Sequence, residues 1–166
     1  MRKFVRAVDT FNEYFGQGVA LLILPLVFVV VYEVIARKVF HAPTMWAFET
    51  TVYLYGAFFM LGSAYTALHG RHVRIDILSS RLPKRFQTWV QIVTFILMFA
   101  PFVGGLSLAA VVYAANAWLV NEHSWSAWKP PLYLYKTVMP VGLILLFIQG
   151  LAQFIKEIYR LKGEEL

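Results

Sequence analysis

The sequence contains no cysteine. This excludes disulfide bonds, thiolate metal sites and thiol nucleophiles, and it is compatible with either side of a membrane. Charged residues are also scarce, at 14% of the 166-residue chain, whereas 60% of the residues are hydrophobic. Four stretches contain no Asp, Glu, Lys, Arg or His: residues 16–32, 50–68, 86–121 and 137–155. A water-soluble fold cannot bury so much continuous apolar sequence, so we predict a membrane protein.

The uncharged stretches set the number of membrane crossings. A helix needs roughly 20 apolar residues to cross about 30 Å of hydrocarbon, because backbone groups in lipid must bond within their own helix. Residues 16–32, 50–68 and 137–155 fit one crossing each. The remaining stretch, residues 86–121, would extend ~54 Å as a helix, so part of it should tilt or project. Splitting it near Pro101 would leave two halves below the roughly 17 residues that a crossing needs. We predict an all-α membrane protein with one domain and four transmembrane helices, at approximately residues 11–36, 47–69, 83–120 and 137–160.

The basic residues indicate the orientation of these helices. If both termini are cytoplasmic, the outer side keeps few of the 15 Lys and Arg residues, namely Arg37, Lys38, Lys129 and Lys136. The others fall on the inner side, as the positive-inside rule requires: Arg2, Lys3, Arg6, Arg71, Arg74, Arg81, Lys84, Arg85, Lys156, Arg160 and Lys162. The net charge of +6 is therefore explained by topology, and no nucleic-acid partner is expected. No signal-peptide cleavage pattern follows the first apolar run, so we expect that helix to be retained.

The connection between the second and third spans, residues 69–85, is basic and amphipathic. Gly70 follows the second span where a left-handed cap would end it, and Asp76 can cap a new helical turn. From there apolar residues recur at three- and four-residue spacing as far as Val93. We predict an interfacial amphipathic arm in contact with membrane lipid. The alternative is a solvated loop whose basic residues only enforce topology.

The connection between the third and fourth spans, residues 122–136, is aromatic. Trp125 and Trp128 lie close to the tandem Pro130-Pro131, and Trp118, Tyr133 and Tyr135 flank them. Such rings suit headgroup depth, so an aromatic belt is one interpretation. A loop that docks a partner on the outer face is the other, and both stay open at this point.

Three ionisable residues lie near the predicted outer end of the first hairpin. Glu33 and Arg37 are four residues apart and can pair on one helix face, and Glu49 opens the second helix within reach of Arg37. We predict a structural ion-pair cluster that fixes this hairpin or docks a partner. The rival interpretation makes Glu33 the coupling carboxylate of an autonomous small proton-coupled transporter that works as a homodimer.

Catalytic and cofactor sites are not expected. His41, His69, His72 and His123 all lie in or beside loops, whereas a haem-anchoring subunit would need facing histidines within its helices. The sequence has no nucleophile paired with a base, no phosphate-cradling glycine loop and no metal-ligand cluster. We therefore predict no enzyme activity, no cofactor and no metal.

The order of several motifs resembles the small membrane subunit of tripartite ATP-independent periplasmic (TRAP) transporters, the DctQ-type family. An arginine after the first helix is followed by tryptophan and glutamate, as in Arg37 with Trp46 and Glu49. A glycine, basic and aspartate turn follows the second helix, comprising Gly70, Arg71, His72, Arg74 and Asp76. An outer tryptophan and proline loop leads to a proline-glycine start of the last helix, comprising Trp125, Trp128, Pro130, Pro131 and Pro140.

This resemblance implies a multi-pass protein of the bacterial inner membrane that takes part in sodium-coupled organic acid uptake. Its partners would be a large multi-span TRAP membrane subunit, which holds the substrate and sodium sites, and a periplasmic substrate-binding protein. The chain itself would be a scaffold that holds the large subunit in the bilayer. Its outer loop would help to dock the binding protein.

Overall fold

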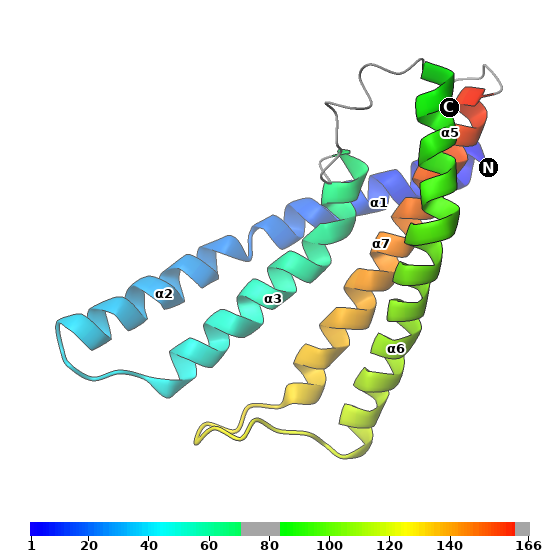
Figure 1. Cartoon of the computed structure of the whole chain (residues 1–166). Coiled ribbons are helices and arrows are strands. Elements are labelled where there is room, and N and C mark those ends of the chain that lie inside the picture. Colours follow the sequence, from blue (N-terminus) through cyan, green and yellow to red (C-terminus); the bar gives the residue numbers. More distant parts are fainter. Residues whose placement is uncertain (71–83, 162–166) are drawn as a thin grey trace.

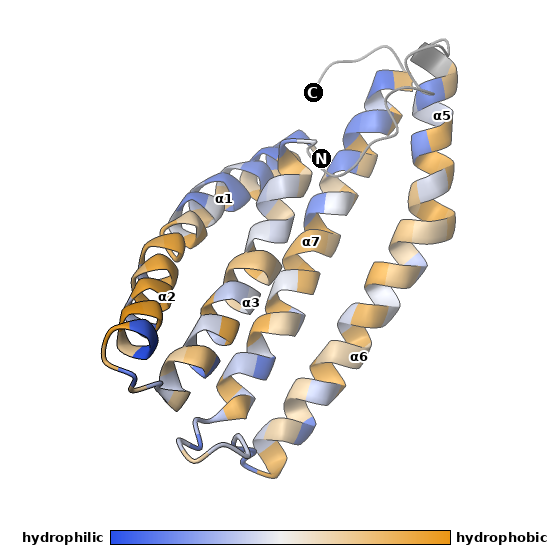
Figure 2. Ribbon diagram, turned by 60° about the vertical axis from the view of Figure 1, so that its left-hand side comes forward, coloured by the Kyte–Doolittle hydropathy of each residue, from blue (hydrophilic) through white to orange (hydrophobic). Residues whose placement is uncertain are grey.

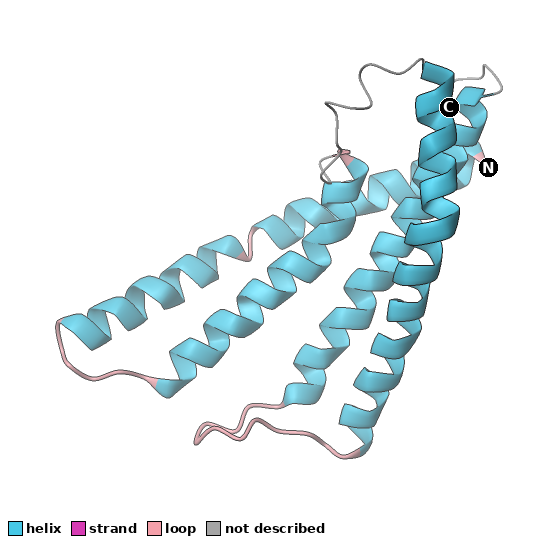
Figure 3. Ribbon diagram, viewed as in Figure 1, coloured by secondary structure: helices cyan, strands magenta, loops and turns pink. Residues whose placement is uncertain are grey.

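The computed structural model of the chain describes residues 1–70 and 84–161, which are helical apart from short connections (Figure 3). In chain order the elements are α1 (Arg2–Ala20), α2 (Ile23–Lys38), α3 (Met45–Leu68), α5 (Lys84–Thr94), the π-helical turn η1 (Phe95–Phe99), α6 (Ala100–Leu119) and α7 (Leu132–Leu161). Within the described residues, four helical segments are long and apolar enough to cross a membrane: Arg2–Lys38, Met45–Leu68, Phe86–Leu119 and Leu132–Leu161. The predicted all-α class with four crossings is confirmed. The core of the predicted interfacial arm, residues 71–83, lies outside the described residues.

The membrane-spanning helices stand in a row, in the order α2, α3, α7 and α6 (Figures 1 and 2). Contacts run from α2 to α3, from α3 to α7 and from α7 to α6, while α1 crosses α3 and α7 at one end. Each span therefore keeps broad faces that no other part of the described chain covers. Only 11–33% of the residues in the most apolar stretch of each span are buried. The exposed surface is hydrophobic, most uniformly on α2 (Figure 2), and must be covered by lipid or by another protein.

Close approach of the two central helices depends on a glycine. A Cβ atom built on Gly142 of α7 would lie 2.5 Å from the Met60 carbonyl oxygen and 2.8 Å from its carbon on α3. No side chain fits between these backbones, so glycine is required at this crossing. Among the glycines in the described part of the chain, Gly142 therefore marks the closest approach of two helix backbones.

The first span begins earlier than predicted and is interrupted. Helix starts at Arg2, not near residue 11, and a turn at Leu21-Leu22 separates α1 from α2. Pro25 explains the interruption, since it has no amide hydrogen to donate to the Leu21 carbonyl. Hydrogen bonds between residues three apart form there instead, such as the bond from Leu24 N to Leu21 O at 3.1 Å. The early start has a different cause, because the polar residues of α1 find partners on α7.

The third span contains a π-helical turn that ends two residues before Pro101. The proline lacks the amide that would bond to the Leu97 carbonyl, and the wider turn accommodates that loss. It also directs Phe95 and Phe99 toward α7. The Phe95 ring stacks on Phe154, with centroids 4.6 Å apart, and the Phe99 ring packs against Gly150.

The last span begins at Leu132, not near residue 137. Pro131 ends the preceding loop, and its fixed φ angle favours the start of a helix directly after it. Pro140 therefore lies inside α7, and the expectation that it marks the start of the last helix is wrong. Gly142 follows it and makes the close contact with α3.

Candidate functional site

The polar side chains gather at the two ends of the helix row. At one end lie the α2–α3 connection and the α6–α7 connection, and at the other lie α1 and the end of α7 (Figure 1). Met1 and Tyr159 meet at this second end, where the tyrosine hydroxyl donates to the methionine sulfur at 3.7 Å. The second end corresponds to the side predicted as cytoplasmic.

Glu33 organises the end of the first hairpin where α2 connects to α3. Its Oε1 accepts hydrogen bonds from Arg37 Nη2 at 2.7 Å and from Arg37 Nε at 3.2 Å. Its Oε2 accepts a bond from the Thr44 amide at 3.2 Å and another from the Thr44 hydroxyl. The Trp46 ring packs against Tyr32, with centroids 5.3 Å apart. Glu33 therefore joins the end of α2 to the start of α3, and each carboxylate oxygen has a donor.

Glu49 does not join this cluster, contrary to the prediction. Its Oε1 accepts a hydrogen bond from the Ser124 hydroxyl at 2.6 Å, whereas its Oε2 is buried without a partner among the described residues. Two physical reasons account for this. Arg37 is already satisfied by the nearer Glu33 one turn away. Glu49 also precedes Tyr53 by one turn, and the Tyr53 ring stacks on Tyr135 of α7 at 4.6 Å, which turns this face of α3 toward the α6–α7 loop.

The α6–α7 loop is closed by paired backbone groups and an ion pair. Leu132 N donates to Glu122 O at 2.9 Å, and Ser124 N donates to Pro130 O at 2.9 Å. Lys136 Nζ lies 2.5 Å and 2.7 Å from the two Glu122 carboxylate oxygens. It also lies 4.2 Å from the centre of the Tyr113 ring. The loop conformation is therefore fixed at its base.

The tryptophans that the sequence singled out differ in exposure. Trp118 donates from Nε1 to Thr137 Oγ1 at 2.9 Å and so ties α6 to α7. Trp128 is 47% exposed, and Trp125 is fully exposed at 100%. The base of the loop is fixed, and Trp125 is available to lipid or to a partner.

The opposite end holds a buried polar network that sequence reasoning missed. Asn12 Nδ2 donates to Gln149 Oε1 at 2.6 Å, and Gln149 Nε2 donates to Asp9 Oδ1 at 3.1 Å. Lys156 Nζ completes the chain at 2.6 Å from Asp9 Oδ2. Asn12 and Gln149 are 2% and 0% exposed. A signal was available, since Gln149 is a polar residue inside a long apolar stretch and Asp9 and Asn12 share helical spacing. Pairing them requires knowing that α1 crosses α7.

The cap that ends the second span is confirmed. Gly70 has φ 63°, and its amide donates to Ala67 O at 3.0 Å. Beside it His69 Nε2 lies 3.3 Å from Glu13 Oε2, and Gln153 Nε2 donates to the Ala67 carbonyl. The remaining residues of the predicted turn lie outside the described residues: Arg71, His72, Arg74 and Asp76. Across the described part of the chain, no group of three or more His, Asp or Glu side chains could hold a metal ion.

Charge exchange tests the revised pairing at the hairpin. We expect Glu33→Arg with Arg37→Glu to recover much of the assembly and thermal stability lost in either single variant, because the pair remains at four-residue spacing. The exchange of Arg37 with Glu49 should give no recovery, since these two side chains do not meet. Fluorescence-detected gel filtration of membrane extracts, before and after heating, measures assembly and thermal stability for both exchanges. Recovery in the second exchange but not in the first would contradict the observed pairing.

Comparison with known proteins identifies related sequences. A family model described as "Tripartite ATP-independent periplasmic transporters, DctQ component" matches residues 26–160. The chain is also similar to the sialic acid TRAP transporter permease protein SiaT of Haemophilus influenzae (strain 86-028NP), with 25% identity over 99 residues. Those residues make up 57% of this chain and 16% of that protein, so the chain spans well under a quarter of the length of the curated relative.

Proposed function

The chain belongs to the DctQ component family of TRAP transporters, and we propose that it acts as the fixed scaffold beside a large, multi-span transport subunit. It is a multi-pass protein of the bacterial inner membrane. The large subunit would hold the substrate and sodium sites. The curated relative is named for sialic acid, and we infer by analogy that this chain supports sodium-coupled uptake of an organic acid.

The observation that carries this proposal is the single row of helices. A row leaves every span with uncovered apolar faces, and a second membrane protein can pack against them without displacing any part of this chain. The row is also held at both ends, by Glu33 with Arg37 and Thr44 at one end and by Asn12 with Gln149 at the other. Between these ends the spans contain long uncharged stretches. This combination favours a rigid frame over a moving transport core.

The proposed topology has both termini in the cytoplasm. It is supported by the basic residues near the end where Met1 meets Tyr159. The closed α6–α7 loop then faces the periplasm and presents Trp125 to the aqueous side of the membrane. We propose that this loop contributes to docking of the periplasmic substrate-binding protein, since exposed tryptophans are frequent anchors of interfaces.

Purification of the carboxyl-tagged chain from native membranes tests the scaffold role. We expect a large multi-span protein to co-purify in equal amount, and we expect the chain alone in liposomes to show no uptake. The Trp125→Ala variant should retain the large subunit but lose most of the captured binding protein, and Trp128→Ala is the matched comparison. Isolation of homodimers that transport alone would favour the rival proton-coupled transporter.

A further inference from the structure

Helix α1 buries a polar side chain and exposes aromatic ones. Its polar Asn12 faces inward and is 2% exposed, whereas Phe11 and Tyr14 are 54% and 70% exposed. Burying an amide while exposing aromatic rings is favourable only where the outer medium is itself apolar. The aromatic part of the outer face of α1 is therefore suited to contact lipid, and Arg6 and Thr10 are exposed beside it.

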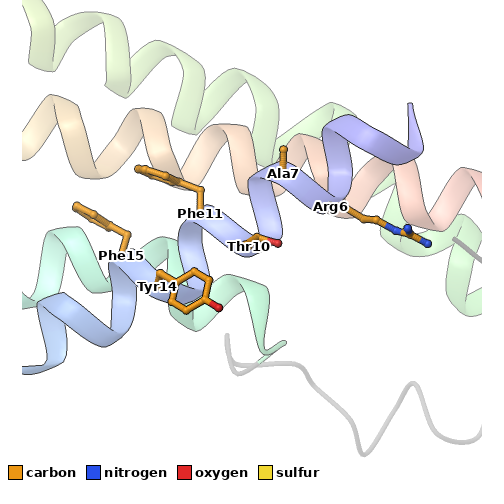
Figure 4. Close-up of a pocket in the computed structure, with 6 residues that line it drawn as sticks. All are labelled: Arg6, Ala7, Thr10, Phe11, Tyr14 and Phe15. Carbon is orange, nitrogen blue, oxygen red and sulfur yellow. The ribbon is translucent and has the colours of Figure 1, made fainter.

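This outer face carries a shallow, open surface pocket that is lined by side chains of α1 alone. Figure 4 shows the side chains that line it: Arg6, Ala7, Thr10, Phe11, Tyr14 and Phe15. The Phe11 and Phe15 rings are stacked, with centroids 5.5 Å apart and planes within 12°. They lie toward the α2 end of the helix, while the Arg6 guanidinium extends toward the amino end (Figure 4). The pocket thus has an apolar end and a cationic end.

The cationic end is not neutralised by the carboxylates of the same helix. Asp9 pairs with Lys156 at 2.6 Å, and Glu13 pairs with His69 at 3.3 Å and accepts a bond from Gln17 at 3.0 Å. Among the described residues no partner engages the guanidinium of Arg6, and Lys3 lies one turn before it. An anion at this position would meet Arg6 without displacing an ion pair to any described residue.

The separation of the two ends along the helix is similar to the thickness of one headgroup layer. Five residues separate Arg6 from Phe11, which corresponds to about 7.5 Å along a helix. The headgroup layer of one leaflet is roughly 5–8 Å thick. The stacked rings adjoin the uncharged stretch that continues into α2, so they would lie at the edge of the hydrocarbon when Arg6 lies among the headgroups.

We propose that the outer face of α1 binds an anionic phospholipid. The phosphate would pair with Arg6, with the Thr10 hydroxyl one turn away as an additional donor, and an acyl chain would lie along Phe11 and Phe15. A bound lipid of this kind would hold α1 at headgroup depth. The assignment goes beyond the scaffold role and does not depend on which transport subunit is present.

Native mass spectrometry of the purified full-length chain tests the proposal. The probes are phosphatidylglycerol and phosphatidylcholine with identical acyl chains, added after delipidation. We expect the wild type to bind the first phosphatidylglycerol more tightly, and Arg6→Gln to weaken that step about fivefold. Lys129→Gln removes the same charge at the other end of the molecule and should leave the first step unchanged. Phe11→Ser should weaken both lipids without abolishing the preference for phosphatidylglycerol.

Several outcomes would overturn the proposal. Equal binding of the two lipids would mean that the face is a non-selective apolar surface. Equal effects of Arg6→Gln and Lys129→Gln would mean that binding depends on the net charge of the protein and not on a site at Arg6. Glycerol phosphate that competes with the intact lipid at equal concentration would indicate an anion site without a lipid chain. Circular dichroism of each variant verifies that the helices are retained. A failure to co-purify the large subunit would count against the scaffold role and leave this assignment unaffected.

Discussion

Replacing Gly142 with alanine should loosen the centre of the helix row and weaken the protein more than other single-methyl additions. The added Cβ would meet the Met60 carbonyl oxygen at 2.5 Å, and the obstacle is backbone, which cannot rotate away as a side chain can. Overpacking of this kind costs about 1–3 kcal/mol. The better helix propensity of alanine offsets up to about 1 kcal/mol of that cost. We expect a net loss of stability, measured as a lower thermal midpoint of tryptophan fluorescence in detergent.

Gly62→Ala is the matched control for this prediction. Gly62 lies on α3 two residues from Met60, and a Cβ built on it meets nothing within 4 Å. It should therefore be neutral or slightly stabilising, because only the helix propensity changes. If the two alanine variants unfold at the same temperature, the close α3–α7 contact does not govern the stability of the row. If only Gly142→Ala unfolds early, capture of the large subunit should fall with it.

The sequence predicts the number of crossings because each uncharged stretch is close to the thickness of a bilayer or longer. It does not predict their order in space. The α6 helix, for example, is apolar on all sides, so its periodicity does not reveal that Ala110 and Ala114 face α7. Gly142 could be recognised as a small residue, but its partner Met60 could not, since any residue can contribute backbone.

The polar sites divide in the same way between local and distant contacts. Glu33 and Arg37 lie four residues apart, and local spacing alone is enough to propose their pair. Glu49 was assigned to the same cluster because it is close in sequence, but Ser124, 75 residues away, holds it. The packing of Tyr53 on Tyr135 turns this face of α3 toward the distant partner, and it depends on α3 lying beside α7. Sequence distance is therefore a reliable guide within one helix and a poor one across the row.

The second large effect is expected at the buried amide pair between α1 and α7. Gln149→Met keeps the side-chain volume but removes the acceptor of the Asn12 amide at 2.6 Å. A buried donor left without a partner costs about 1–3 kcal/mol. Asp9 Oδ1 loses a donor as well, although Lys156 still pairs with its other oxygen. We expect a lower thermal midpoint and faster proteolysis of α1, measured with the full-length chain in detergent.

A double substitution separates this polar contact from simple packing. Asn12→Leu with Gln149→Met removes both partners, and replacing a pair by apolar groups of similar shape can be almost neutral. It also removes Asn12 Oδ1, which is buried without a partner among the described residues. The double variant should therefore be more stable than Gln149→Met alone, with a coupling of about 1–2 kcal/mol in a double-mutant cycle.

Gln17→Met is the control for the same chemical change at an exposed position of α1, where the glutamine donates to Glu13 at 3.0 Å. It should change stability by less than about 0.5 kcal/mol. Additive losses at Asn12 and Gln149 would mean that the two amides do not depend on each other. Strong coupling would instead mean that a buried hydrogen bond fixes α1 across α7, and hence fixes the depth at which the outer face of α1 meets the membrane.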